Sequence, residues 1–212
     1  MTILEMQGLA AKNAGRVLAV AGTARKNEAL EAIAQALYRN QGYILSENEK
    51  DLAAAMASGM KQSLLDRLAL SAQRMDAIVE GVRQVAALPD PIGEVTKMST
   101  RPNGLVIGKR RVPLGVIGII YEARPNVTVD AAALCLKSGN AVILRGGKEA
   151  FRSNKAFVAV LRDALESAGL PRDCVALVED TSRESANELM NLTDYLDVLI
   201  PRGGAGLIQS VV

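Results

Sequence analysis

The chain has 212 residues, of which 49% are hydrophobic and 23% are charged, and its formal net charge is +2. This balance and an aromatic content of 3% argue against a nucleic-acid-binding surface, and the lack of any apolar run of about 20 residues argues against a membrane span. With no histidine and two cysteines, the chain has no Ser-His or Cys-His catalytic pair and no usual donor set for a metal ion. We therefore expect a cytoplasmic globular protein that binds no metal, nucleic acid or membrane.

Residues 1–88 are predicted to be helical, because apolar residues recur at helical spacing, as at Leu30, Ile33 and Leu37. Ser46 is followed three residues later by a glutamate, the spacing of a capping box, which predicts that a helix begins there. Prolines after residue 88 are expected to end the last of these helices. We find no motif that indicates chemistry in this part of the chain.

A β-hairpin is predicted within residues 92–111. Two segments of mixed charged and β-branched residues, 94–98 and 105–111, are joined through residues 101–104 (RPNG), whose proline and glycine suit a tight reversal. Such a hairpin has an open edge. We therefore expect it to pair with another segment of the chain or with another subunit.

Residues 112–212 alternate short apolar runs with segments of helical period, which predicts a parallel Rossmann-like α/β sheet with flanking helices. Helices are expected to begin near Thr128, at Ser153, and at a capping box that starts at Thr181. The expected strands are 116–120, 141–144, 175–178 and 198–200.

Ligands of an open parallel sheet bind beyond the carboxyl ends of its strands. After the second predicted strand, two cations flank a glycine pair, which suits an anionic group close to the backbone or, equally, a solvated turn; these residues are Arg145, Gly146, Gly147 and Lys148. After the last strand, the turn at Gly203 and Gly204 precedes a predicted helix start, which favours a phosphate, although such a turn is more often structural.

Two polar residues follow the first strand of this sheet. Asn126 has an amide that could donate to an oxyanion, but it could instead cap the helix expected near Thr128. Arg124 could bind a phosphate or carboxylate, or be solvated. Cys135 lies in an apolar helical run and Cys174 has no neighbouring cation, so we expect neither to be a nucleophile.

Taken together, the motifs of the chain resemble the N-terminal part of the gamma-glutamyl phosphate reductase (glutamate-5-semialdehyde dehydrogenase) family, within the aldehyde dehydrogenase superfamily. The similarity extends over essentially all 212 residues. The segments that carry it are 65–70 (LDRLAL), 111–118 (RVPLGVIG), 121–128 (YEARPNVT), 137–149 (KSGNAVILRGGKE) and 200–207 (IPRGGAGL).

The resemblance implies reduction of L-glutamyl 5-phosphate to L-glutamate 5-semialdehyde and phosphate by NADPH, in proline biosynthesis. In this family a cysteine thiolate of a separate catalytic domain forms a thioester that hydride then reduces. Residues 1–212 then correspond to the NADPH-binding domain, with that catalytic domain absent and no activity expected from the chain alone. A truncated nucleotide-binding or protein-interaction module is the alternative.

The resemblance also suggests roles for individual residues. Asn126 matches the oxyanion-stabilising asparagine, and Arg145 takes the place of a cation near the adenosine ribose, where a second cation at Lys148 would suit the 2′-phosphate of NADPH or NADP. Gly203 and Gly204 would face the pyrophosphate, and Arg124 would contact the substrate. A homo-oligomer is expected, and glutamate 5-kinase is the expected pathway partner.

Overall fold

A parallel sheet forms the centre of the computed structural model, which describes residues 1–211, with the side chains at positions 205, 210 and 211 left aside. Its strands lie in the order β5 (Val175–Leu177), β4 (Ala141–Arg145), β3 (Val116–Tyr121) and β6 (Val198–Arg202). All residues of β3 are buried, as expected for an apolar strand with neighbours on both sides and helices on both faces. The predicted parallel α/β sheet is therefore confirmed.

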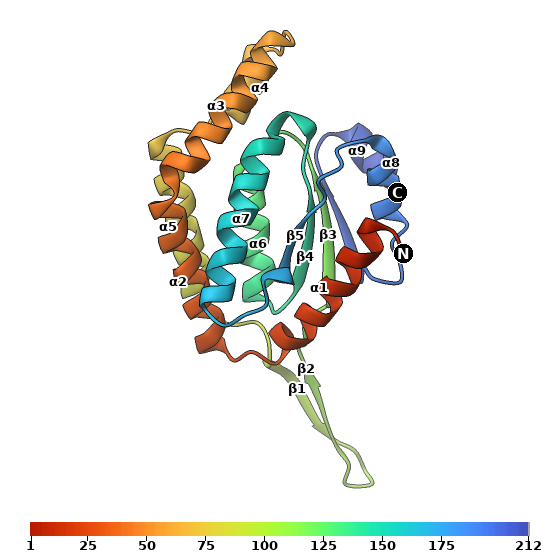
Figure 1. The fold of residues 1–212 in the computed structure, drawn as a ribbon. Helices are drawn as coiled ribbons and strands as arrows, with labels where there is room; N and C mark the ends of the chain where they lie inside the picture. Colours follow the sequence, from red (N-terminus) through yellow and green to blue (C-terminus); the bar gives the residue numbers. More distant parts are fainter. Residues whose placement is uncertain (212) are drawn as a thin grey trace.

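Helices cover both faces of this sheet (Figure 1). Side chains that alternate along β3 point to opposite sides, so Ile117 and Ile119 join the core beneath α6 (Asn126–Lys137) and α7 (Phe151–Ser167). Val116 and Ile120 instead face α1 (Ile3–Ala19) and the segment around α8 (Arg183–Met190). The short helix α9 (Ala205–Val211) follows β6.

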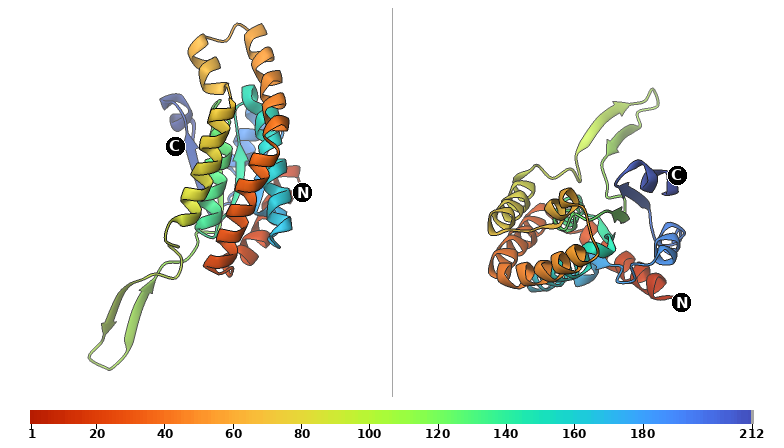
Figure 2. Two further views of the ribbon diagram at one scale, coloured as in Figure 1. Left: turned by 90° about the vertical axis from the view of Figure 1, so that its left-hand side faces the viewer. Right: turned by 90° about the horizontal axis from the view of Figure 1, so that it is seen from above.

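The predicted N-terminal helices are confirmed; α1 covers the other face of the sheet, and α2 to α5 form a second layer on the side of α6 and α7 (Figures 1 and 2). α2 packs against both α5 and α7, and α3 packs along α7. Buried Ile78 and Val82 form the inner face of α5. Within residues 1–211, none of the helices is long and apolar enough to cross a membrane. The helices are α2 (Thr23–Arg39), α3 (Gln41–Ala57), α4 (Gln62–Leu68) and α5 (Ala72–Ala87).

Three predicted helix starts are wrong by one to five residues. Ser46 lies inside α3, where its hydroxyl donates to the carbonyl of Tyr43 at 2.8 Å, because α3 follows α2 after a single residue. α7 begins two residues before Ser153. The N-cap of α8 is Ser182, whose hydroxyl accepts a hydrogen bond from the Ser185 N–H, and not Thr181.

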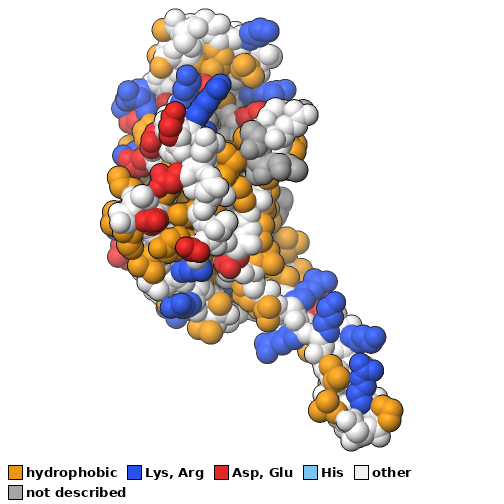
Figure 3. Space-filling view, turned by 90° about the vertical axis from the view of Figure 1, so that its right-hand side faces the viewer, with side chains coloured by type: hydrophobic (Ala, Val, Ile, Leu, Met, Phe, Trp, Pro, Cys, Tyr) orange, Lys and Arg blue, Asp and Glu red, His pale blue; other side chains and the backbone are white. Residues whose placement is uncertain are grey.

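The predicted hairpin is confirmed as β1 (Val95–Thr100) and β2 (Val106–Arg110), which pair antiparallel around a turn where Gly104 has φ +82°. It projects from the end of the sheet opposite to α3 and α4, and nearly all of its side chains are exposed (Figures 1 and 2). Lys and Arg side chains gather along it (Figure 3). It pairs with no other strand in the described part of this chain, so of the two expected partners another segment is wrong and another subunit stays a prediction.

Candidate functional site

The crevice between β3 and β6 is the point where the strand order of the sheet reverses. The chain runs from β3 to β4 and β5 in one direction, then crosses to β6 on the other side of β3. In open parallel sheets, ligands bind at the carboxyl ends of the strands that flank such a reversal. Here those ends carry residues 121–126 and 202–206, two of the segments that the sequence singled out.

A hollow of about 360 Å³ lies between these two segments and is lined by Arg124, Arg202, Gly203 and Gly204 among others. The carboxylate of Glu122 accepts a hydrogen bond of 2.9 Å from the Gly204 N–H. A Cβ atom at Gly203 would lie 2.7 Å from an oxygen of the same carboxylate, so a larger residue here would require the Glu122 side chain to shift. The N–H group that we expected to face a phosphate thus has an anionic partner already.

A second hollow, of about 420 Å³, lies beyond β4 and is lined by Arg145 and Gly147 together with apolar side chains, including Met60, Leu64 and Leu207. Arg145 is half-buried, and its Nη2 donates to the carbonyls of Thr181 and Ser182, both at 2.8 Å. Burial lowers the pKa of Arg145, and the nearby carboxylates of residues 180 and 149 partly offset this. An arginine remains a cation under these conditions. This hollow therefore combines an apolar wall with the hydrogen-bonded cation of Arg145, two further arginines and the carboxylates of Glu122 and Glu149.

Gly146 and Lys148 do not line this hollow. A Cβ atom at Gly146 would collide with the Asn154 amide, which belongs to a buried chain of hydrogen bonds. In that chain Thr128 Oγ1 donates to Asn154 Oδ1 at 2.9 Å and lies 2.7 Å from the Tyr121 hydroxyl. Gly146 therefore serves the packing of the strand ends. Lys148 is exposed at the start of a 3-10 turn.

Asn126 is the first residue of α6, so the alternative in which it caps a helix starting near Thr128 is not what the structure shows. Its side-chain amide donates to the carboxylate of Asp130 at 3.0 Å. An amide nitrogen carries two N–H groups, and the second one is available to a ligand. Desolvation raises the pKa of Asp130, and the hydrogen bond from Asn126 and the charge of Arg202 offset part of that rise.

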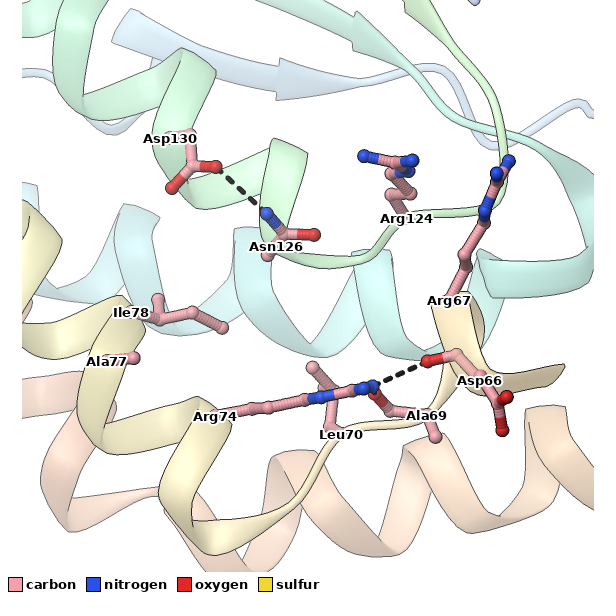
Figure 4. Close-up of a pocket in the computed structure, with 10 residues that line it drawn as sticks. All are labelled: Asp66, Arg67, Ala69, Leu70, Arg74, Ala77, Ile78, Arg124, Asn126 and Asp130. Atoms are coloured by element: carbon pink, nitrogen blue, oxygen red, sulfur yellow. Dashed lines mark hydrogen bonds between the residues drawn. The ribbon is translucent and has the colours of Figure 1, made fainter. Parts of the chain in front are cut away.

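Asn126 lies in a third hollow, of about 520 Å³, with Arg124 and two arginines that our reading of the sequence had not selected (Figure 4). These are Arg67, on α4, and Arg74, on α5. Asp66 and Asp130 also line it. The one sequence signal for Arg67 was its position in the segment 65–70, which carried the family resemblance without indicating any chemistry.

The predicted site residues thus lie at one edge of the sheet but are divided among three hollows. Asn126 belongs to the hollow of Figure 4, Arg145 to the one beyond β4, and Gly203 and Gly204 to the crevice between β3 and β6. Arg67 and Arg124 line all three. These two arginines therefore lie where the three hollows meet.

Neither cysteine reaches this edge. Burial raises the pKa of Cys135 to about 12, and burial followed by the charge of Asp173 raises the pKa of Cys174 to about 12. A buried thiol with such a pKa is a poor nucleophile at neutral pH. In residues 1–211, no cluster of three or more thiol or carboxylate side chains is arranged to hold a metal ion.

Comparison with known proteins relates this geometry to a family. The family model described as "Aldehyde dehydrogenase family" matches residues 2–198. Among curated relatives, the gamma-glutamyl phosphate reductase of Geobacillus kaustophilus is 60% identical over 201 residues, which is 95% of this chain and 49% of the relative. That of Clostridium botulinum is 58% identical over 212 residues, 100% of this chain and 51% of the relative.

Solved structures agree with these sequence matches. The crystal structure of gamma-glutamyl phosphate reductase from Thermotoga maritima is similar with a TM-score of 0.97 and 44% identity, over 99% of this chain and 51% of that one. The crystal structure of gamma-glutamyl phosphate reductase from Saccharomyces cerevisiae is similar with a TM-score of 0.92 and 30% identity, over 100% of this chain and 54% of that one. The chain spans about half the length of these relatives. From the extent of the family match and the shared fold, the chain belongs to the aldehyde dehydrogenase family.

Proposed function

We propose that residues 1–212 are the NADPH-binding domain of a gamma-glutamyl phosphate reductase, which reduces L-glutamyl 5-phosphate to L-glutamate 5-semialdehyde and phosphate. In this domain, residues 112–212 form the nucleotide-binding core, behind the helices of residues 1–88 and the hairpin of residues 92–111. The supporting observation is that Asn126, Arg145 and the Gly203–Gly204 turn lie in adjoining hollows at one edge of the sheet. Identities of 58–60% to named reductases support the same assignment.

The hollow beyond β4 fits the adenosine end of NADPH. Its apolar wall of Met60, Leu64 and Leu207 suits an adenine ring, and the guanidinium of Arg145 suits the ribose and its 2′-phosphate. Gly147 also lines this hollow, and a Cβ atom there would lie 2.7 Å from a Glu149 carboxylate oxygen and 3.3 Å from the Ala123 nitrogen, so the position is closely packed against the chain. Lys148 does not line the hollow, but it is exposed close to Arg145 in the chain, and its side chain would have to reach toward the hollow to contact the 2′-phosphate. When bound, NADPH supplies a hydride.

The residues of this chain then bind and orient the substrate. The free N–H of Asn126 would donate to the carbonyl oxygen that gains negative charge. Arg124 would contact an anionic group of the substrate. Because Cys135 and Cys174 are buried, neither takes the part of the family's thiolate, and we expect no turnover from these 212 residues alone.

Calorimetric titration of the chain with NADPH tests the proposal. We expect binding that Arg145→Gln weakens about tenfold, because a charge-assisted contact is lost. Arg101→Gln, in the exposed hairpin turn, is the matched control and should leave the affinity unchanged. NADH should bind more weakly than NADPH. An unchanged affinity of the Arg145→Gln variant would disprove the assignment of this hollow to the cofactor.

The hairpin supports a second candidate function, as an interaction module. Its faces carry exposed apolar side chains such as Met98, Val106 and Ile107, and its outer edges are unpaired in the described chain, which favours pairing with another chain. We propose that the hairpin joins copies of this chain into a homo-oligomer. If the chain associates but binds no NADPH up to millimolar concentration, the interaction function is favoured.

A cytoplasmic location is part of the same proposal. It is supported by the two unpaired cysteines, Cys135 and Cys174, since cysteines remain reduced in that compartment. Glutamate 5-kinase would be the pathway partner. Separating cell fractions and detecting the protein by antibody would test the location, and recovery in the periplasmic or extracellular fraction would contradict it.

A further inference from the structure

The segment 65–70, which joins α4 to α5, is held in a fixed shape at the mouth of the hollow in Figure 4. Asn48, 1% exposed, donates through its Nδ2 to the Leu68 carbonyl at 2.9 Å and accepts from the Leu70 N–H at 2.8 Å. Arg74 donates through Nη1 to the carbonyls of Asp66, at 2.6 Å, and Ala69. Several backbone groups around Arg67 are thus tied to other elements.

The side chain of Arg67, unlike those of Asn48 and Arg74, does not hold the segment 65–70 in place. Within residues 1–211, neither Arg67 nor Arg124 has a hydrogen bond or ion pair to its guanidinium, although both line all three hollows. In Figure 4, Arg67 extends from α4 toward the loop that carries Arg124. Two guanidinium groups on separate, anchored elements that face common space form a site for an oxyanion with several oxygens, such as a phosphoryl group.

The neighbouring groups point to a small, highly charged ligand. The hollow of Figure 4 is lined by three arginines, two carboxylates and Asn126, beside the apolar side chains of Ala69, Leu70, Ala77 and Ile78. A phosphorylated amino acid carries a phosphoryl group, a carboxylate and an ammonium group, so it matches both signs of charge. The hollow beyond β4 has the apolar wall that an adenine requires. The two ligand chemistries therefore favour different hollows.

We propose that Arg67 and Arg124 bind the phosphoryl group of an amino-acid acyl phosphate, and that Arg74 is a positioning residue that holds the segment carrying Arg67. This proposal rests on the proposed reductase function. It assigns a ligand contact to α4, which lies outside the sheet edge and outside the nucleotide-binding core.

Titration with inorganic phosphate tests the proposal. The 212-residue chain is kept in a buffer of low ionic strength that contains no other phosphate, and binding is monitored by phosphorus NMR. We expect Arg67→Gln to weaken binding at least tenfold, and Arg67→Lys, which keeps the charge and loses the planar fork, to have an intermediate effect. Arg101→Gln, on the hairpin, should bind phosphate as the parent chain does. Urea unfolding of each variant checks that the fold is intact, which we expect because Arg67 is exposed.

Competition with NADPH shows whether the two arginines bind the phosphoryl group of the substrate or the pyrophosphate of the cofactor. Phosphate should bind equally well with and without saturating NADPH, and Arg67→Gln should retain the parent affinity for NADPH. Displacement of phosphate by NADPH, or an equal loss of both affinities, would assign the pair to the cofactor pyrophosphate and overturn the proposal. Phosphate binding that does not depend on Arg67 would also overturn it. If NADPH fails to bind while phosphate binding still requires Arg67, the cofactor assignment fails and this inference stands.

Discussion

The amide of Asn126 and the carboxylate of Asp130 face each other across 3.0 Å, one helical turn apart at the start of α6. Desolvation raises the pKa of Asp130, and the Asn126 hydrogen bond counteracts part of that rise. Replacing Asn126 with Ala should therefore raise the pKa of Asp130 further, because the ionised carboxylate loses a donor. Carbon-13 NMR titration of the Asp130 carboxyl measures this. A pKa that stays the same or falls in the variant would show that the bond is not formed in solution.

Glu122 is expected to oppose cofactor binding, because its carboxylate accepts from the Gly204 N–H in the crevice where we place the pyrophosphate. Glu122→Gln keeps an oxygen acceptor and removes the charge, so NADPH should bind several-fold more tightly. The gain should shrink as salt is added, since screening weakens the repulsion. Calorimetry at low and high ionic strength measures both effects. Weaker binding by the variant would mean that the pyrophosphate lies elsewhere.

The ion pair of Lys26 and Asp90 should make folding sensitive to acid. Lys26 Nζ lies 2.6 Å from Asp90 Oδ2, and the two side chains are 2% and 9% exposed. Burial alone would raise the pKa of Asp90, but the hydrogen bonds from Lys26, Thr23 and the Ile92 N–H outweigh it and lower the pKa. The stabilisation is therefore present above the ordinary aspartate pKa of about 3.9 and is lost as the pH falls through the folded-state value.

Asp90→Asn should cost about 3 kcal/mol in the free energy of unfolding at pH 7, because it leaves the buried Lys26 charge without its partner. The difference in the free energy of unfolding between the variant and the parent chain should be smaller at about pH 3, where Asp90 begins to bind a proton. Urea unfolding at both pH values measures it. Asp163→Asn, at an exposed ion pair on α7, is the control and should cost under about 0.5 kcal/mol. An equal cost at both pH values would contradict this account.

Neither cysteine should react with a thiol reagent in the native chain. Burial is the main reason that the pKa of Cys135 and the pKa of Cys174 are each raised to about 12, so thiolate is scarce at neutral pH. Ellman's reagent should modify both residues at once in denaturant and neither on the same timescale without it. Rapid labelling of the native chain, or semialdehyde oxidation by NADP that either cysteine variant abolishes, would contradict the structure.

The hairpin should decide the association state. Met98 and Ile107 are exposed and lie on opposite faces of the hairpin, so replacing both with Lys places charge on each face, and we expect the dissociation constant of the oligomer to rise at least tenfold. The free energy of unfolding of the monomer should change by less than about 0.5 kcal/mol, because the hairpin contributes little to the core. Sedimentation at several concentrations measures association. A parent chain that stays monomeric at all concentrations would rule out the proposed role.

Local sequence rules predicted the sheet and the helices because the signals that define them are local. The strands of the sheet are largely apolar runs of three to six residues, and Gly139 and Gly169 mark helix ends with φ of +73° at both. Helix starts were harder. Ser46 has the spacing of a capping box, but α3 begins at Gln41, because only Asn40 separates it from the end of α2. Packing of the preceding helix, and not the local motif, sets that boundary.

Part of the site could be predicted from the sequence, because the topology of a parallel sheet places several of its residues. Parallel strands bring their carboxyl ends to one edge, so Asn126, Arg145 and Gly203 could be placed together from sequence. Arg67 reaches the same edge from a helix layer that packs over α6 and α7, and no local pattern reports that contact. The packing of Gly146 against Asn154, a residue of α7, is likewise a contact that the local sequence does not indicate, and its role in cofactor binding stays a prediction. Contacts between distant elements were what the sequence could not reveal.

Because β6 is less buried than β3, the pairing of β6 with β3 should open more easily than the pairing of β3 with β4. β3 is buried throughout, whereas β6 is partly exposed along its length and has a free edge in the described chain. Amide hydrogens of β6 will accordingly exchange with solvent before those of β3 and β4, through local openings that cost less than global unfolding. Each such fluctuation separates Gly204 from Glu122. Ligands that bridge β3 and β6 will therefore slow exchange at β6 selectively.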